Sequence, residues 1–85
     1  MKSFQYTIKD ELGIHARPAG LMVQKAAGFP CSITITKDGR SVDAKRIMAV
    51  MSLGVKCGME VTIQCEGEQE EEACDALKAF FEETL

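Results

Sequence analysis

Residues 31–43 have the sequence CSITITKDGRSVD, and this stretch decides the fold class. Apolar and hydroxyl side chains alternate from residue 31 to residue 36, which is typical of a strand with one buried and one wet face. The Asp38-Gly39 pair that follows favours the positive φ angles of a tight hairpin turn. Residues 41–43 form a short returning strand, so the stretch predicts an antiparallel hairpin.

The same alternation occurs in two further segments, residues 4–8 and residues 59–65. Strands with one polar face are typical of antiparallel sheets that are covered on a single side. We therefore expect one antiparallel sheet of four strands with helices on its other face. The open face should carry the polar residues Gln5, Thr7, Ser32, Thr34, Thr62 and Gln64.

Three segments change to a helical period: residues 16–27, residues 46–53 and residues 68–85. Gly28 and Gly54 are expected to end the first two. The first helix should turn inward a stripe of small or apolar side chains, at Ala16, Ala19, Gly20, Val23, Ala26 and Ala27. The third should turn inward Ala73, Ala76, Leu77, Phe80 and Phe81. The order strand, helix, strand, strand, helix, strand, helix indicates an α+β fold.

The chain has 85 residues, of which 46% are hydrophobic and 27% are charged, and this predicts one small domain over residues 1–85. So short a domain has little room for a deep cleft, and function should lie on its surface. A net charge of -3 without Lys/Arg clusters argues against a nucleic-acid partner. No apolar run suits a signal peptide or a membrane span, so we expect a cytoplasmic protein with no membrane insertion.

The four cysteines are widely spaced and form no Cys-x-x-Cys pair; they are Cys31, Cys57, Cys65 and Cys74. Because the chain has one histidine, ligands for zinc are lacking and no metal is expected. In a cytoplasmic protein all four thiols should be unbridged. Cys31 and Cys65 fall in the buried phase of their strands, so both should be buried.

The single histidine, His15, lies where the strand period ends and the first helical period begins. If His15 is the N-cap, the backbone N–H groups of Ala16 and Arg17 are unpaired beside the imidazole, while Pro18 has none to offer. An anion there would meet free donors, the positive helix end and the Arg17 guanidinium. The pattern predicts a site that holds a phosphoryl group. The alternative is an exposed loop histidine beside a solubilising arginine.

Residues 46–53 are apolar around most of the helix, with Ala49, Val50 and Leu53 on one side and Ile47, Met48 and Met51 on the other. One side of a helix in a two-layer domain must face outward. Ile47, Met48 and Met51 are therefore candidates for a docking patch, which Leu21 and Gln24 would extend from the face of the first helix that carries Arg17. The alternative is additional core packing under a loop.

Two motifs, GIHARPA at residues 13–19 and AKRIMAVMSLG at residues 44–54, resemble the histidine-containing phosphocarrier (HPr) family of the bacterial sugar phosphotransferase system. The resemblance implies an open-faced β-sandwich of four antiparallel strands and three helices. It also implies that His15 accepts a phosphoryl group on Nδ1 from enzyme I and passes it to enzyme IIA domains. Arg17 would pair with the phosphoryl oxygens.

The residues themselves also favour a carrier over an enzyme. The chain has no phosphate-binding Gly-x-x-x-x-Gly-Lys-Ser/Thr loop and no acidic pair suited to magnesium, so no nucleotide or other cofactor is expected. Donor and acceptor chemistry must come from partners, and we expect the chain to act as a monomer. A shallow histidine can serve once a partner closes over it.

Two positions depart from the family pattern. Arg46 stands where the family commonly has a serine that a kinase phosphorylates, so no regulatory serine is expected. We expect Arg46 to be solvated and paired with a nearby acid. Leu12 replaces a small polar residue often seen before the glycine of the first motif, which removes one potential hydrogen bond to the phosphohistidine.

Two further functions remain open from the sequence. One is an HPr-like regulatory paralogue that docks partners without carrying sugar-transport flux. The other is a small-ligand-binding α+β domain, which the short chain disfavours because it would need a concave pocket.

Overall fold

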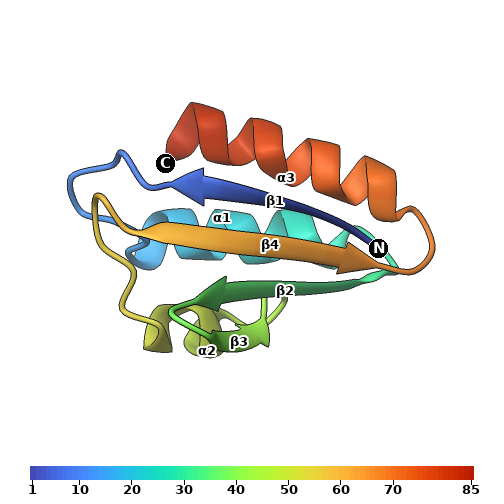
Figure 1. Ribbon diagram of the computed structural model, residues 1–85, viewed down its shortest axis with the longest axis horizontal. Coiled ribbons are helices and arrows are strands. Elements are labelled where there is room, and N and C mark those ends of the chain that lie inside the picture. Colours follow the sequence, from blue (N-terminus) through green and yellow to red (C-terminus); the bar gives the residue numbers. More distant parts are fainter.

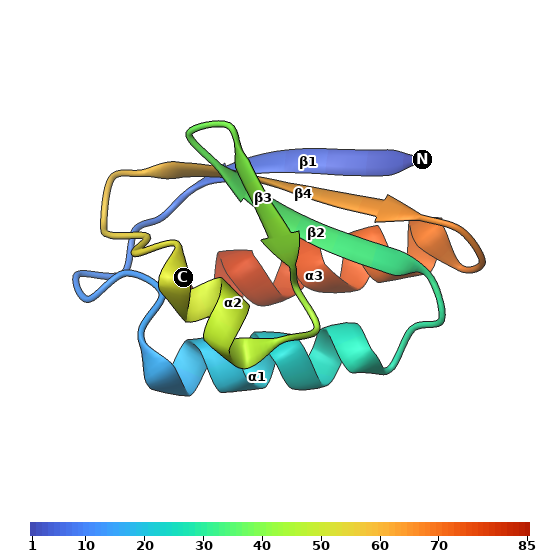
Figure 2. The same ribbon diagram turned by 90° about the horizontal axis from the view of Figure 1, so that it is seen from below.

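The computed structural model describes residues 1–85, and its elements follow the predicted order (Figure 1). They are β1 (Lys2–Thr7), α1 (Ala16–Ala27), β2 (Ser32–Lys37), β3 (Arg40–Asp43), α2 (Ile47–Ser52), β4 (Glu60–Glu66) and α3 (Glu70–Thr84). All three helices lie on one side of the sheet, as Figure 2 shows. The α+β fold with an open-faced sheet is confirmed.

The four strands form one antiparallel sheet in the order β1-β4-β2-β3. On the open face, Thr34 Oγ1 donates to Gln64 Oε1 at 3.5 Å, and the hydroxyls of Thr36 and Ser41 lie 2.6 Å apart. The polar residues predicted for this face are exposed or half-buried, which confirms their placement.

The opposite face of the sheet and the helices bury one apolar core. Its 21 buried residues form a single cluster, and no polar or charged residue is among them. The ring of Phe81 is fully buried in this core and makes edge-to-face contacts with Phe4, Tyr6 and Phe80 at centroid distances of 5.8, 5.5 and 6.0 Å. None of the helices is long and apolar enough to cross a membrane.

The inward face of α1 differs from the predicted stripe. Its buried residues are Pro18, Ala19, Met22 and Ala26, whereas Ala16 and Ala27 are exposed. The prediction was wrong for those two alanines because small size alone does not determine which side of the helix faces the core. The contact face follows the spacing 18, 22 and 26, which brings a fully buried methionine onto the sheet.

Two helices begin later than expected. Helix α2 starts at Ile47 with Arg46 as its N-cap, and α3 starts at Glu70 instead of residue 68. Gly67 and Gln69 have φ values of 124° and 64°, so the chain turns there before α3 begins. Glu70 Oε1 accepts the Gly67 N–H at 3.0 Å and holds that turn.

Helix α2 has six residues and is capped by cations from the β2–β3 hairpin. Lys37 Nζ donates to the Leu53 carbonyl at 2.9 Å, and the Arg40 guanidinium donates to the Ser52 carbonyl and hydroxyl at 3.3 and 3.2 Å. No basic residue lies in the last turn of α2 itself, so the hairpin supplies the positive charge that suits a helix C-terminus.

The cysteines differ sharply in exposure. Cys31 and Cys65 are buried as predicted, Cys74 is buried as well, and Cys57 is exposed, all as free thiols. Burial raises the pKa of the Cys65 thiol to about 12, and the neighbouring Cys74 and Cys31 raise it further. Burial also raises the pKa of Cys74. Because reagents reach exposed thiols first and Cys57 is the one exposed cysteine, Cys57 alone is suited to fast reaction.

We predict that the folded protein at about pH 8 reacts rapidly with a thiol reagent at one site, and that denatured protein without reductant shows four free thiols. Cys57→Ser should remove the fast reaction and leave three slow thiols. Two or more fast sites would show that the part of the core that holds Cys31, Cys65 and Cys74 opens readily. Fewer than four thiols after denaturation would reveal a disulfide bond.

Candidate phosphoryl-binding site

His15 is the N-cap of α1, with extended backbone angles of φ -96° and ψ -174°. Ala19 N–H donates to the His15 carbonyl at 2.9 Å, whereas the N–H groups of Ala16 and Arg17 have no acceptor within the protein. Pro18 has no N–H, as suits the first turn. The helix therefore begins beside the imidazole with two free donors and the positive end of its dipole.

A shallow surface hollow surrounds the imidazole. It is lined by Asp10, His15, Arg17, Pro18, Leu21, Glu83 and Thr84. The His15 side chain is 38% exposed, and its Nε2 lies 4.0 Å from Asp10 Oδ1. Arg17 is exposed and forms no ion pair. Its guanidinium is free to meet an incoming anion.

The loop before His15 is fastened to the segment between α2 and β4. Ile14 N–H donates to the Val55 carbonyl at 3.0 Å. Gly13 has φ +68°, and a Cβ placed on it would lie 2.3 Å from the Val55 carbonyl oxygen. Only glycine fits this approach, and the contact fixes the point at which α1 begins.

The predicted docking side chains are exposed on two helices, α1 and α2. Ile47, Met48 and Met51 are exposed, with Met48 reaching 77%, and Leu21 is exposed on α1. A Cβ placed on Gly20 of α1 would lie 3.7 Å from Ile47 Cδ1 of α2, so the two helices contact each other there. We call Leu21, Gln24, Ile47, Met48 and Met51 the docking patch. Core packing accounts for the other side of α2, where Val50 and Leu53 are buried.

Sequence reasoning missed Asp10 near His15, and it considered Leu12 only as the loss of a potential hydrogen bond. Leu12 is 71% exposed in the loop before the site and adds apolar surface there. Asp10 lies within ion-pair distance of the imidazole. An apolar residue within a run of polar and turn residues was a usable signal for Leu12. Asp10 had no such signal, because four residues of irregular backbone separate it from His15.

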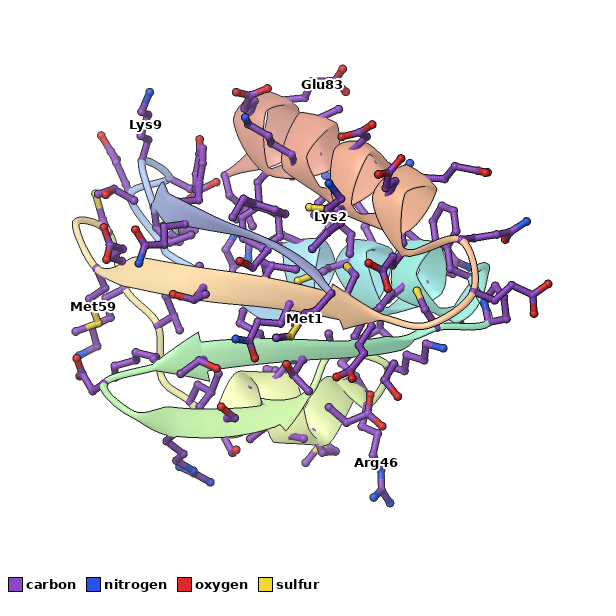
Figure 3. All side chains as sticks on the ribbon, turned by 45° about the vertical axis from the view of Figure 1, so that its right-hand side comes forward. Met1, Lys2, Lys9, Arg46, Met59 and Glu83 are labelled. Carbon is purple, nitrogen blue, oxygen red and sulfur yellow. The ribbon has the colours of Figure 1, made fainter.

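Arg46 is exposed and projects away from the molecule, as Figure 3 shows. It forms no ion pair, so the expected pairing with a nearby acid was wrong. The closest acid in sequence, Asp43, is engaged in its own turn: its Oδ1 accepts the Lys45 N–H at 2.8 Å, and its carbonyl accepts the Arg46 N–H at 3.2 Å. Arg46 therefore presents an unneutralised charge beside the docking patch.

Comparison with known proteins identifies the family to which this chain belongs. The family model described as "PTS HPr component phosphorylation site" matches residues 2–83. The chain belongs to the HPr family. Phosphocarrier protein HPr of Lysinibacillus sphaericus is 41% identical over 83 residues, covering 98% of this chain and 94% of that protein. HPr-like protein Crh of Halalkalibacterium halodurans is 47% identical over 78 residues, covering 92% of this chain and 93% of that protein.

Solved HPr structures share the fold. The histidine-containing phosphocarrier protein of a Mycoplasma superposes with a TM-score of 0.95 at 36% identity, covering 98% of this chain and 94% of that one. An HPr from Thermoanaerobacter tengcongensis, with a TM-score of 0.78 and 47% identity over 98% of this chain and 95% of that one, was solved as a dimer. The HPr fold thus occurs in dimers as well.

We predict that Gly13→Ala destabilises the protein by about 2–4 kcal/mol, because the left-handed backbone disfavours a side chain and the new Cβ overlaps Val55. Gly54→Ala is the matched control: Gly54 has φ +62° with open space around it, so about 1–2 kcal/mol should be lost. Urea denaturation measures both. Equal losses would show that the approach to Val55 contributes nothing.

Proposed function

We propose that residues 1–85 act as one phosphocarrier domain of the phosphoenolpyruvate-dependent sugar phosphotransferase system, in the cytoplasm. His15 would accept a phosphoryl group on Nδ1 from phosphorylated enzyme I and pass it to enzyme IIA domains. The observation that carries this proposal is the half-exposed imidazole at the N-cap of α1 beside two free N–H groups.

The chemistry of the site suits a phosphoryl group on that ring. The Nδ1 lone pair attacks phosphorus as the bond between phosphorus and the donor atom of enzyme I breaks, so the phosphoryl group changes carrier atom and nothing is oxidised or reduced. Phosphoryl transfer relies on positioning and on stabilisation of charge on the oxygens. The N–H groups of Ala16 and Arg17 and the helix dipole supply that charge stabilisation from fixed positions, and the Arg17 guanidinium adds to it when it closes on the anion.

Partners would supply the rest of the reaction. The hollow around His15 is shallow, so a partner must cover it to exclude water. The docking patch lies beside it and offers flexible apolar side chains that can adapt to more than one surface. We propose that the monomer is the carrier form, because it leaves His15 and the patch accessible together.

The regulatory alternative, a paralogue that docks partners without carrying flux, is kept by one observation. The Crh relative is 47% identical to this chain, the same identity as the HPr from Thermoanaerobacter tengcongensis, so this chain resembles both kinds of protein equally. The two functions differ in the second step of transfer. A carrier passes its phosphoryl group to enzyme IIA domains, whereas a regulatory paralogue would do so poorly.

We predict that enzyme I and phosphoenolpyruvate load one acid-labile phosphoryl group, and that His15→Ala abolishes loading. Arg17→Ala should stay folded and slow transfer by about one to two decades, because one charge-assisted contact is lost. Lys25→Ala, an exposed cation on the same helix, is the control. Intact mass and quenched transfer to an enzyme IIA domain measure both steps.

An unchanged rate in Arg17→Ala would remove Arg17 from the site. Loading at a residue other than His15 would refute the proposed acceptor. Normal loading followed by poor transfer to enzyme IIA domains would instead support the regulatory alternative.

We predict that the positive charge of Arg46 steers docking towards acidic partner surfaces. Arg46→Glu should weaken enzyme I binding by about two- to tenfold at low salt, and the difference should shrink as ionic strength rises. Lys78→Glu makes the same charge reversal on α3 and should have a smaller effect. Titration calorimetry at several salt concentrations tests this. Equal affinities for the parent and Arg46→Glu would refute this prediction. We also expect no serine switch in this chain, and modification of the parent by a kinase at another serine would contradict that expectation.

A further inference from the structure

The Asp10 carboxylate lies next to the ring nitrogen of His15 that the phosphoryl group does not occupy. Asp10 Oδ1 is 4.0 Å from Nε2, and the two side chains are 30% and 38% exposed. No other ion pair involves His15. Asp10 is therefore the acid placed to influence the proton on that nitrogen.

The backbone fixes the position of this carboxylate. Asp10 Oδ1 accepts the Leu12 N–H at 2.8 Å, and the Asp10 carbonyl accepts the Gly13 N–H at 2.9 Å. On the other side, the Asp10 N–H donates to the backbone oxygen of Leu85 at 2.9 Å. One of these bonds holds the carboxylate itself and the other two fix the backbone that carries it, so the side chain loses less conformational freedom when it contacts the imidazole.

The position matters because a neutral imidazole carries its proton on one nitrogen only. Nδ1 can attack phosphorus only when its lone pair is free, so the proton must be on Nε2. The partner of one ring nitrogen decides which tautomer is present. A carboxylate near Nε2 favours a proton there and leaves Nδ1 unprotonated, as in other aspartate–histidine pairs.

We propose that Asp10 is a positioning residue that holds the Nε2–H tautomer of His15 and so keeps Nδ1 ready for the phosphoryl group. The role of Asp10 in phosphoryl transfer rests on the proposed function, whereas its effect on the position of the His15 ring proton does not. At 4.0 Å the contact is longer than a direct hydrogen bond. Catalytic hydrogen bonds often shorten when a partner closes over the site and excludes water.

Three variants distinguish the effect of Asp10 on the His15 ring proton from the effects of neighbouring acids. Asp10→Asn removes the charge and keeps an oxygen for the Leu12 N–H, so the turn should be preserved. Glu11→Gln removes the same charge from the next residue, which is exposed and makes no hydrogen bond or ion pair. Glu83→Gln tests the other acid that lines the hollow.

The ring proton can be located directly, since His15 is the only histidine. Long-range ¹H–¹⁵N correlation spectra of the unphosphorylated variants are recorded at about pH 9, above the ordinary titration range of imidazole. We expect the Nε2–H to Nδ1–H ratio to fall about two- to fivefold in Asp10→Asn and to stay unchanged in Glu11→Gln, as suits a half-exposed pair. The rate of loading by enzyme I should fall in proportion to the fraction of the Nε2–H tautomer, and only in Asp10→Asn.

An identical tautomer ratio in the parent and Asp10→Asn would overturn the proposal. So would an equal shift in Glu11→Gln, or a shift confined to Glu83→Gln. A parent that takes up no phosphoryl group would refute the proposed function instead, and the tautomer ratios would still decide whether Asp10 orients the proton of His15.

Discussion

The site depends on one close approach between two backbones. Gly13 lies so near the Val55 carbonyl that no side chain fits between them, and Ile14 donates to the same oxygen at 3.0 Å. Ile14 and Val55 are both buried, so the contact joins the loop before α1 to the segment after α2. It brings the start of α1, where His15 is the N-cap, beside the end of α2 (Figure 2).

The core and the site have opposite chemistry. The core holds no polar or charged residue, and every group proposed to bind a phosphoryl group lies outside it. Free N–H groups at a helix start are tolerated at the surface because water satisfies them, whereas burial would cost about 1–3 kcal/mol for each. A domain with one small core can therefore keep unsatisfied donors available to a ligand without weakening its own stability.

The fold could be predicted where the sequence has a clear period. The strands around Ile33 and Ile63 follow strict alternation, and the fold class came from them. Patterns of size alone failed, since Ala16 and Ala27 are as small as the buried Ala19 but face solvent. At the site, His15 and Arg17 stand out because a cap and a first turn are local features. The Asp10 contact and the isolation of Arg46 depend on turn geometry, which no periodicity describes.

The hairpin cations that cap α2 also set its rigidity. A helix of six residues is far too short to persist on its own, because nucleation is unfavourable and few hydrogen bonds follow it. Lys37 and Arg40 close its last carbonyls from a strand pair that belongs to the sheet. The exposed methionines of α2 are thus presented on a preformed scaffold. A partner that docked there, as proposed, would meet backbone that is already ordered, so its affinity would not be reduced by the ordering of that backbone.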